Sequence, residues 1–315
     1  MSILANRHDF LLLFEVTNGN PNGDPDAGNM PRIDPNTNRG IVTDVCLKRK
    51  VRNFVDLFAP AREAAPANEY NILIKQGAVI EAEQQPAEAA AKNTENPDQL
   101  AGATEAEKAK NWLCRKFYDV RTFGGVLSTG DDIMKGSAWG QVRGPVQFTF
   151  GQSYHPITPL EISITRCAVT KVADASKERT MGNKHIVPYA LYVAKGYVSP
   201  AFAERTGFTQ ADLDLLFEAL ANMFEHDRSA ARGEMIVRGI YDFEHVGTQA
   251  DANSEQNKRE ARLGCAHAHE LFEGIKVQLR PGKDFPESFA DYLVENTWTK
   301  ENLPKGVQLH PRHVR

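Results

Sequence analysis

The densest group of side chains that could bind a polyanion is the run Lys48-Arg49-Lys50-Val51-Arg52. Lys48 and Arg52 are four residues apart, so on a helix they share one face. Ammonium and guanidinium groups bind phosphate oxygens through charge and hydrogen bonds, independently of base sequence. The run therefore predicts either a phosphate-binding helix or a charged helix face that contacts only solvent.

A second basic segment spans residues 166–185 and has few acidic side chains. Met181 stands next to Gly182 within it, and an apolar side chain at a flexible position can displace or cover a base while its basic neighbours contact phosphates. The alternative is a mobile surface loop. The basic residues of the segment are Arg166, Lys171, Lys177, Arg179, Lys184 and His185, and the acidic ones are Asp174 and Glu178.

The segment 18–39 is rich in Asn, Gly and Pro and contains Arg32 and Arg39. Gly and Asn tolerate positive φ and allow close backbone approach, which suits a loop that wraps a ligand. It contains no GxxxxGK[ST] motif, and no strand-GxGxxG-helix pattern occurs in the chain, so nucleotide triphosphate and dinucleotide sites are not predicted. A binding loop and a purely structural loop both remain open.

Asp24, Asp26 and Asp34 of this loop, with Asp131 and Asp132 later, could hold a divalent cation for phosphodiester cleavage. Asp beside Gly and Pro is, however, ordinary turn chemistry. The run Cys265-Ala-His267-Ala-His269 has metal-like spacing but lacks a second cluster of ligands. No set of nucleophile, base and orienting residue is recognisable, so we expect no catalytic residue, metal or cofactor.

Hydrophobic periodicity indicates which elements position these residues. An apolar run predicts a buried strand over 8–17, and Thr43 predicts the N-cap of a helix with Leu47, Val51, Phe54 and Phe58 on one face. We predict a strand over 71–74, a peripheral or partly mobile insertion rather than core over the alanine-rich 81–104, and a helix over 105–118.

The remaining two thirds of the chain alternate between strand and helix patterns. Period-2 alternation predicts half-buried strands at 146–150 and 162–165. A further strand is predicted at 186–193, directly after the basic segment 166–185. Thr209 begins a helix that reaches Phe224. Two more strands, 235–243 and 274–280, flank a loop and helix at 247–262. This order predicts an α+β fold with a sheet of the ferredoxin or RNA-recognition-motif type, in a single elaborated domain over residues 1–315.

Composition fits such a domain: 315 residues with 41% hydrophobic and 25% charged side chains can bury a sizeable core. No apolar run reaches 18 residues, and the four cysteines are scattered, so we expect a soluble, cytoplasmic protein with reduced thiols and no membrane contact.

The net charge is −4. Residues 119–200 carry nine basic and six acidic side chains, and residues 201–315 carry 14 and 19. A polyanion surface must therefore be local, and we expect the acidic last third to meet a basic face of another copy.

Five segments in this order resemble the backbone (Cas7) subunit of type I CRISPR Cascade complexes, with the type I-C form the closest. They are NGNPNGDPD at 18–26, TDVCLKRKVR at 43–52, DVRTFG at 119–124, RGPVQF at 143–148 and MGNKH at 181–185. The resemblance covers about residues 8–195.

The resemblance implies a modified RNA-recognition-motif palm, a fingers insertion at 60–118 and a thumb hairpin at 166–186. Copies would stack head-to-tail as a helical filament on the spacer of CRISPR RNA, which then pairs with target DNA. Other partners would be the CRISPR RNA-processing endonuclease, the large subunit and the small subunits. The RNA-contacting residues expected from the motifs and the basic segments are Asn20, Asn22, Arg32, Lys48, Lys50, Arg52, Phe123, Gly124, Arg143, Arg166, Arg179, Met181, Lys184 and His185.

The chain lacks an aromatic pair of the kind that stacks bases on a recognition-motif sheet, so backbone and shape recognition is the expectation. The leading hypothesis is a non-catalytic RNA-binding scaffold for antiviral defence. The alternative is a metal-dependent RNase of the type III backbone kind that uses Asp24, Asp26 and Asp34. A protein-interaction scaffold without RNA is a third possibility.

Overall fold

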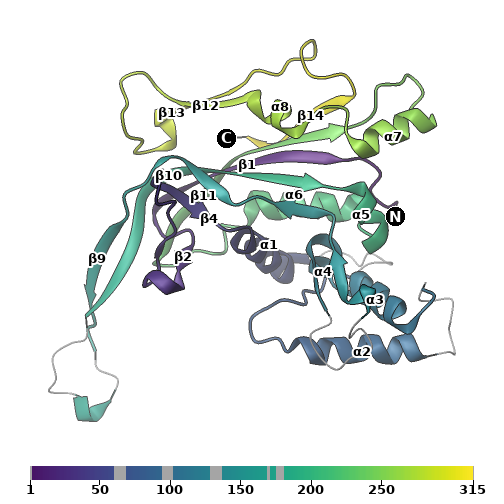
Figure 1. Cartoon of the computed structure of the whole chain (residues 1–315). Coiled ribbons are helices and arrows are strands. Elements are labelled where there is room, and N and C mark those ends of the chain that lie inside the picture. The colour runs from purple at the N-terminus through teal and green to yellow at the C-terminus, as the bar shows by residue number, and fades with distance from the viewer. Residues whose placement is uncertain are drawn as a thin grey trace.

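The computed structural model describes residues 2–59, 69–93, 102–127, 137–168, 171–174 and 181–314. Its centre is an antiparallel sheet with the strand order β14-β11-β1-β10-β8-β4, and β7 and β9 also pair with β10 (Figure 1). The strands of this sheet are β1 (His8–Gly19), β4 (Arg39–Val42), β7 (Val146–Phe148), β8 (Gly151–Pro156), β9 (Leu160–Thr165), β10 (Met181–Val198), β11 (Arg232–His245) and β14 (Val307–Val314).

Three small two-stranded ladders and eight α-helices surround this sheet in the described residues. The ladders are β2 (Gly23–Asp24) with β3 (Met30–Pro31), β5 (Gly124–Val126) with β6 (Gln141–Arg143), and β12 (Ile275–Leu279) with β13 (Tyr292–Asn296). The helices are α1 (Asp44–Phe58), α2 (Ile80–Lys92), α3 (Glu105–Lys116), α4 (Tyr118–Phe123), α5 (Pro200–Thr206), α6 (Gln210–Asn222), α7 (Glu255–Leu263) and α8 (Ala268–Glu273). This is a mixed α+β architecture. No helix of the described residues is long and apolar enough to cross a membrane.

Strand β1 is the central strand, and it is buried on both faces. Phe10, Leu12 and Phe14 face one core cluster, whereas Leu11 and Leu13 face another. A strand between two packed layers needs apolar residues at every position, which explains why the sequence shows a continuous apolar run rather than alternation. The predicted strand over 8–17 is confirmed.

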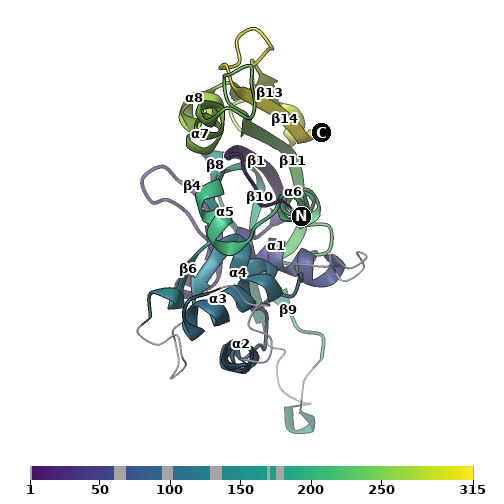
Figure 2. The same ribbon diagram turned by 90° about the vertical axis from the view of Figure 1, so that its right-hand side faces the viewer.

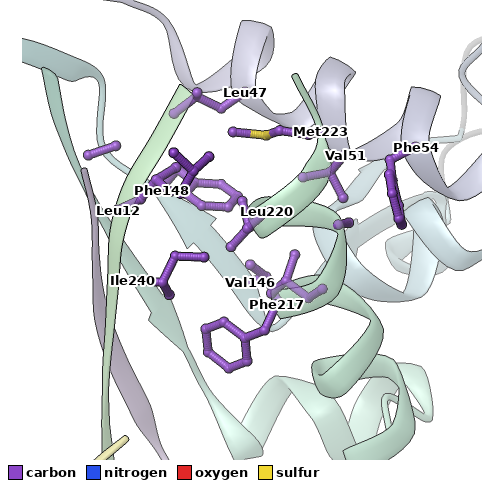
Figure 3. Packing of buried hydrophobic residues seen from close by; sticks show 14 of the residues in the cluster. Leu12, Leu47, Val51, Phe54, Val146, Phe148, Phe217, Leu220, Met223 and Ile240 are labelled. Carbon is purple, nitrogen blue, oxygen red and sulfur yellow. The ribbon is translucent and has the colours of Figure 1, made fainter. Parts of the chain in front are cut away.

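Helices α1 and α6 cover one face of the sheet. Thr43 caps α1 by accepting a hydrogen bond from the Cys46 amide at 3.2 Å, and Thr209 and Asp212 form the capping box of α6. The apolar side chains of both helices interdigitate with those of the sheet, as Figure 3 shows for Leu47, Val51, Phe54, Phe217, Leu220 and Met223 against Leu12, Val146, Phe148 and Ile240. Both predicted helix starts are confirmed.

The C-terminal third covers the opposite face. Leu271 and Phe272 of α8 pack with Tyr241 and Phe243 of β11, and Tyr292 of β13 packs with Tyr189 and Leu191 of β10. In Figure 2 these C-terminal elements lie above the sheet, and α1 and α6 lie below it. Because layers cover both faces of β1, the central strand offers, within the described residues, no open platform on which bases could stack.

A separate helical layer lies below α1 and has its own core. Ala87 and Ala91 of α2 are buried against Ala109 and Leu113 of α3. The prediction that 81–104 is a peripheral or partly mobile insertion rather than core is wrong for Ala87 and Ala91, because small alanine side chains let two helices approach closely and form a core. The prediction of a strand at 71–74 is also wrong: the amides of Leu73 and Ile74 donate to the carboxylate of Asp119 at 2.9 and 3.0 Å instead of to a neighbouring strand.

Strand β9 and the beginning of β10 form a two-stranded arm that extends away from the sheet (Figure 1). The prediction that 162–165 is half-buried is wrong, since every residue of β9 is exposed. Residues 181–185, predicted as part of the excursion, belong to β10. The arm starts before residue 166, the predicted start of the thumb. Residues 60–68 and 94–101 of the predicted fingers segment, and residues 169–170 and 175–180 of the predicted thumb, lie outside the described part of the chain.

Candidate functional site

Lys48 and Arg52 of α1 converge on the ring of Phe123 at the end of α4. The Lys48 Nζ atom lies 5.9 Å from the ring centroid, and the Arg52 Cζ atom lies 5.2 Å from it. The spacing of four residues places both cations on the same side of α1. The structure thus brings together three of the residues predicted from sequence.

Lys48 also has polar partners. Its Nζ atom donates to Asp44 Oδ2 at 2.9 Å and to Gln147 Oε1 at 3.4 Å. The side chain of Lys48 is 13% exposed and that of Asp44 is 23% exposed. A phosphate that approaches Lys48 must therefore compete with the Asp44 carboxylate.

Arg52 has a structural role in addition to its position beside Phe123. Its Nε atom donates to Asp119 Oδ2 at 2.8 Å, and Asp119 is fully buried. The same carboxylate accepts the amides of Leu73 and Ile74. Arg52 therefore joins α1 to the helical layer below it.

Lys50 points to the other side of α1. Two residues along a helix correspond to a rotation of roughly 200°, so Lys50 cannot share a face with Lys48 or Arg52. Its side chain is 8% exposed, and its Nζ atom pairs with Asp227. Arg232 Nε lies 2.8 Å from the same carboxylate. Lys50 thus lies in the interior, where it ties α1 to the segment before β11.

The turn after Phe123 is packed at backbone level. Gly124 has a φ of 76°, and a Cβ atom there would lie 2.1 Å from the Val142 carbonyl oxygen. Gln147 Nε2 donates to the carbonyl oxygens of Gly144 at 3.2 Å and of Phe123 at 3.5 Å. Glycine is required here because β5 and β6 approach too closely for a side chain.

Arg143 lies beside the turn at Phe123 and Gly124, because it pairs with Gly124 across the β5–β6 ladder. Its side chain is exposed, and its Cζ atom lies 4.4 Å from the centroid of the Phe202 ring. Lys48, Gln147 and Arg143 therefore form a row that runs from α1 to α5. Sequence reasoning missed Gln147, although the alternation of polar and apolar residues at 146–150 would have marked it as facing away from Val146 and Phe148.

The predicted loop residues shape the chain before α1. Asn20 is buried, and its Nδ2 atom donates to the Asn29 carbonyl oxygen at 2.7 Å. Asn22 Oδ1 accepts the amide of Thr43 at 2.9 Å and its hydroxyl at 3.0 Å. Arg32 pairs with Asp24 at 3.2 Å. These contacts fix the entry into α1.

Two of the three loop carboxylates proposed as metal ligands, those of Asp24 and Asp34, accept hydrogen bonds within turns. Asp24 Oδ1 accepts the amide of Asp26 at 3.1 Å, and Asp34 accepts the amide of Asn36 at 2.9 Å. The second of these hydrogen bonds holds the pKa of Asp34 below its ordinary value. Within the described residues, no three His, Cys, Asp or Glu side chains are grouped so that they could hold a metal ion, and Asp131 and Asp132 lie outside those residues.

The arm presents two different faces. In its antiparallel register, Met181 is opposite Thr165 and His185 is opposite Glu161, so these four share one face. Lys184 is opposite Ile162 on the other face, beside Leu160 and Ile164. Met181 is 67% exposed near the far end of the arm, Arg166 is exposed just after β9, and Arg179 lies outside the described residues.

The residues around α1, the loop before it and the arm lie on one side of the central sheet. Helix α1 stands between the arm and the layer of α2, α3 and α4, all of which extend below the sheet in Figures 1 and 2. The candidate site is therefore the surface around α1, with the row of Lys48, Gln147 and Arg143 on one side and the loop of Asn20, Asn22 and Arg32 on the other.

A curated relative from Haloferax volcanii, described as CRISPR-associated protein Cas7, is 27% identical over 234 residues, which are 67% of this chain. The aligned region spans 62% of that relative's length, less than two thirds of it.

Solved structures of low sequence identity are also similar. A CRISPR RNA-guided surveillance complex chain is 14% identical, with 76% of this chain and 69% of that chain covered and a TM-score of 0.43. A chain of a pre-nicking surveillance complex is 15% identical, with 76% and 78% covered and a TM-score of 0.44. A chain of the type III-B Cmr-beta complex bound to cognate target RNA is 11% identical, with 75% and 60% covered and a TM-score of 0.40.

The family model described as CRISPR-associated protein Cas7 matches residues 6–297, which is most of the chain. This is the family that the five sequence motifs indicate. The chain belongs to the Cas7 family of CRISPR backbone subunits.

Proposed function

We propose that this chain is the CRISPR RNA-binding backbone subunit of a type I-C Cascade surveillance complex. Copies of it stack head-to-tail along the guide spacer and present the spacer for pairing with target DNA in antiviral defence. The observation that supports this most is the placement of Lys48 and Arg52 on α1 between the arm and the helical layer.

Within this proposal, the central sheet with α1 and α6 is a modified RNA-recognition-motif palm. The layer of α2 and α3 supplies the fingers, and the arm of β9 and β10 is the thumb, with Met181 beside the displaced nucleotide. The partners are CRISPR RNA, further copies of the chain, the RNA-processing endonuclease and the large and small subunits, in the cytoplasm.

The proposed recognition is independent of spacer sequence. Both faces of β1 are covered in the described part of the chain, so contacts come from cationic side chains and from the shape of the surface around α1. A backbone subunit must accept any spacer, and phosphate contacts satisfy that requirement.

The experiment is co-expression of the chain with a CRISPR array, followed by purification and analysis of bound RNA. We expect protected guide RNA with the wild type and a several-fold loss of RNA with Lys48→Glu. Lys300→Glu is the matched control, because Lys300 is exposed in the C-terminal segment that covers the other face of the sheet. An RNA-free monomer from cells that express the array would contradict the proposal.

We further propose that the subunit is not itself a nuclease, because Asp24 and Asp34 are already occupied by turn amides and Arg32. Incubation of the assembled complex with complementary RNA and Mg²⁺ tests this. Regularly spaced cuts that disappear on Asp24→Ala, Asp26→Ala or Asp34→Ala substitution would establish the RNase alternative instead.

A further inference from the structure

A cavity of about 570 Å³ opens where α3, β6 and α5 meet, at the junction of the helical layer and the sheet. Three cationic side chains, Lys110, Arg143 and Arg205, line it, and so does Trp139. Of these cations only Arg143 was predicted from sequence as a site residue. We call this cavity the junction site.

Within the described residues, the three cations of the junction site differ from Lys48, Lys50, Arg52 and Arg32 in having no carboxylate partner. Among the described residues, no carboxylate lies within ion-pair distance of Lys110, Arg143 or Arg205. Two carboxylates line the cavity but have other partners. Glu204 pairs with Arg262, and Glu107 accepts the Ala103 amide at 2.8 Å.

Local contacts hold these cations in place. The Arg143 and Arg205 Cζ atoms lie 4.4 and 5.6 Å from the centroid of the Phe202 ring. Lys110 is only 8% exposed, and its Nζ atom donates to the Arg205 carbonyl oxygen at 2.7 Å. A guanidinium stacked on a ring keeps its N–H edge available for a bidentate anion and loses little entropy when it binds one. A largely buried ammonium without a carboxylate also favours an incoming anion.

The position of the junction site indicates which anion it receives. Arg143 also lines a second cavity of about 460 Å³ together with Gln147, whose Oε1 atom contacts Lys48. The donors therefore continue from α1 through Gln147 and Arg143 to Arg205. The phosphates of an extended nucleic-acid strand are regularly spaced, so they match a series of spaced cationic side chains. An acidic side chain of a protein partner would need only one such cation.

We infer that the junction site binds backbone phosphates of a single-stranded nucleic acid, which extends the strand path from α1 to α5 and adds Lys110 and Arg205 to the binding residues. This inference rests on the proposed function. It predicts that the tightest phosphate contacts are made at Arg143 and Arg205, where no carboxylate has to be displaced.

The test is fluorescence anisotropy of a fluorescein-labelled single-stranded RNA titrated with the purified full chain at several salt concentrations. Arg143→Gln and Arg205→Gln should each weaken binding about three- to tenfold, and each should lower the slope of log K against log salt by about 0.7. Arg259→Gln is the control, because Arg259 is exposed on α7 and lines neither of these cavities. It should change neither value.

Unchanged affinity and slope for both Arg143→Gln and Arg205→Gln, with binding lost in Lys48→Glu, would overturn the junction site and leave the proposed function intact. Failure of the wild type to bind RNA would overturn both. If the two variants reduced self-association in sedimentation experiments without RNA and left RNA affinity unchanged, the cavity would receive an acidic protein segment, and the inference would be wrong.

Discussion

The Arg121 Nη2 atom lies 2.8 Å from Asp212 Oδ1, and both side chains are fully buried. Arg121 also donates to the Glu69 carbonyl oxygen at 2.7 Å, and Asp212 belongs to the capping box of α6. One ion pair thus joins the helical layer to the helix that covers the central sheet.

Replacement of Asp212 by Asn keeps the side-chain shape but leaves the Arg121 guanidinium without a carboxylate. We expect a loss of about 3–5 kcal/mol in the free energy of unfolding, measured by chemical denaturation. Glu225→Gln is the control, because the Glu225–Arg228 pair is exposed and contributes less than about 1 kcal/mol. A loss for Asp212→Asn no larger than that of the control would show that the buried pair does not hold the two parts together.

Gly124→Ala should destabilise the turn beside Phe123. A Cβ atom would lie 2.1 Å from the Val142 carbonyl oxygen at a φ of 76°, and neither the contact nor the dihedral angle can be relieved by rotating a side chain. We expect a cost of more than about 2 kcal/mol by thermal denaturation. Gly125→Ala, in the same strand, has its nearest contact at 3.9 Å and should change stability by less than about 0.5 kcal/mol. Equal effects of the two substitutions would rule out close packing as the reason for Gly124.

Asp44→Asn should strengthen RNA binding by the free chain while it slightly weakens the fold. Without its carboxylate partner, Lys48 can receive a phosphate directly. An ion pair between residues four apart on a helix contributes about 0.3–0.5 kcal/mol, which corresponds to a gain of about twofold in affinity. The first turn of α1 loses an acidic side chain, which costs about 0.3–1 kcal/mol of stability.

Anisotropy titration and chemical denaturation measure these two changes separately. Asp56→Asn is the control, because Asp56 lies on the same helix and pairs with Lys75 at 3.7 Å, away from Phe123. If Asp44→Asn bound RNA no better than the control, Lys48 would not be restrained by Asp44.

The segment before α7 should become less stable in acid. Glu260 accepts the hydroxyl of Thr248 at 2.6 Å and its amide at 2.8 Å, and these bonds lower the pKa of Glu260 to about 2. Because the folded pKa is below the ordinary value of 4.5, the stabilisation is complete above about pH 4.5 and is lost as the pH falls toward 2.

Hydrogen exchange of the Thr248 amide, corrected for the intrinsic rate, should therefore accelerate between pH 5 and pH 2.5 in the wild type. Glu260→Gln should show fast exchange at both pH values. Glu255→Gln on the same helix, where the carboxylate is 92% exposed, should behave as the wild type does. Slow exchange in Glu260→Gln would mean that other contacts hold this segment.

The elements that could be predicted from sequence are those whose causes are local. The apolar run of β1, the Thr43 cap of α1 and the capping box at Thr209 each depend on residues a few positions apart. The strand predicted at 71–74 failed because its amides bind Asp119, more than 40 residues away. The alanines of α2 could be placed in a core only once α3 packed against them.

The same distinction holds for the site. The spacing of Lys48 and Arg52 placed them together, but the carboxylates that pair with Arg52 and Lys50 come from elsewhere in the chain. Asp119 is 67 residues from Arg52, and Asp227 is 177 residues from Lys50. A count of cations in sequence therefore overestimates the charge that this helix presents, because Asp44 on the same helix and two carboxylates from distant segments pair with its cations.

Strand β10 runs without interruption from Met181 near the tip of the arm to Val198 inside the sheet. Eighteen extended residues span about 60 Å, and the inner part, from Val187 to Val198, is fixed by pairing with β1. The arm thus continues a strand that is held in the sheet, and bending it in the plane of the sheet would strain the pairing of β10 with β1. If copies assemble along a strand of RNA, the spacing between the nucleotides that Met181 of successive copies contacts is set by the covalent geometry of β10 and by its register with β1. That spacing is then the same for every spacer.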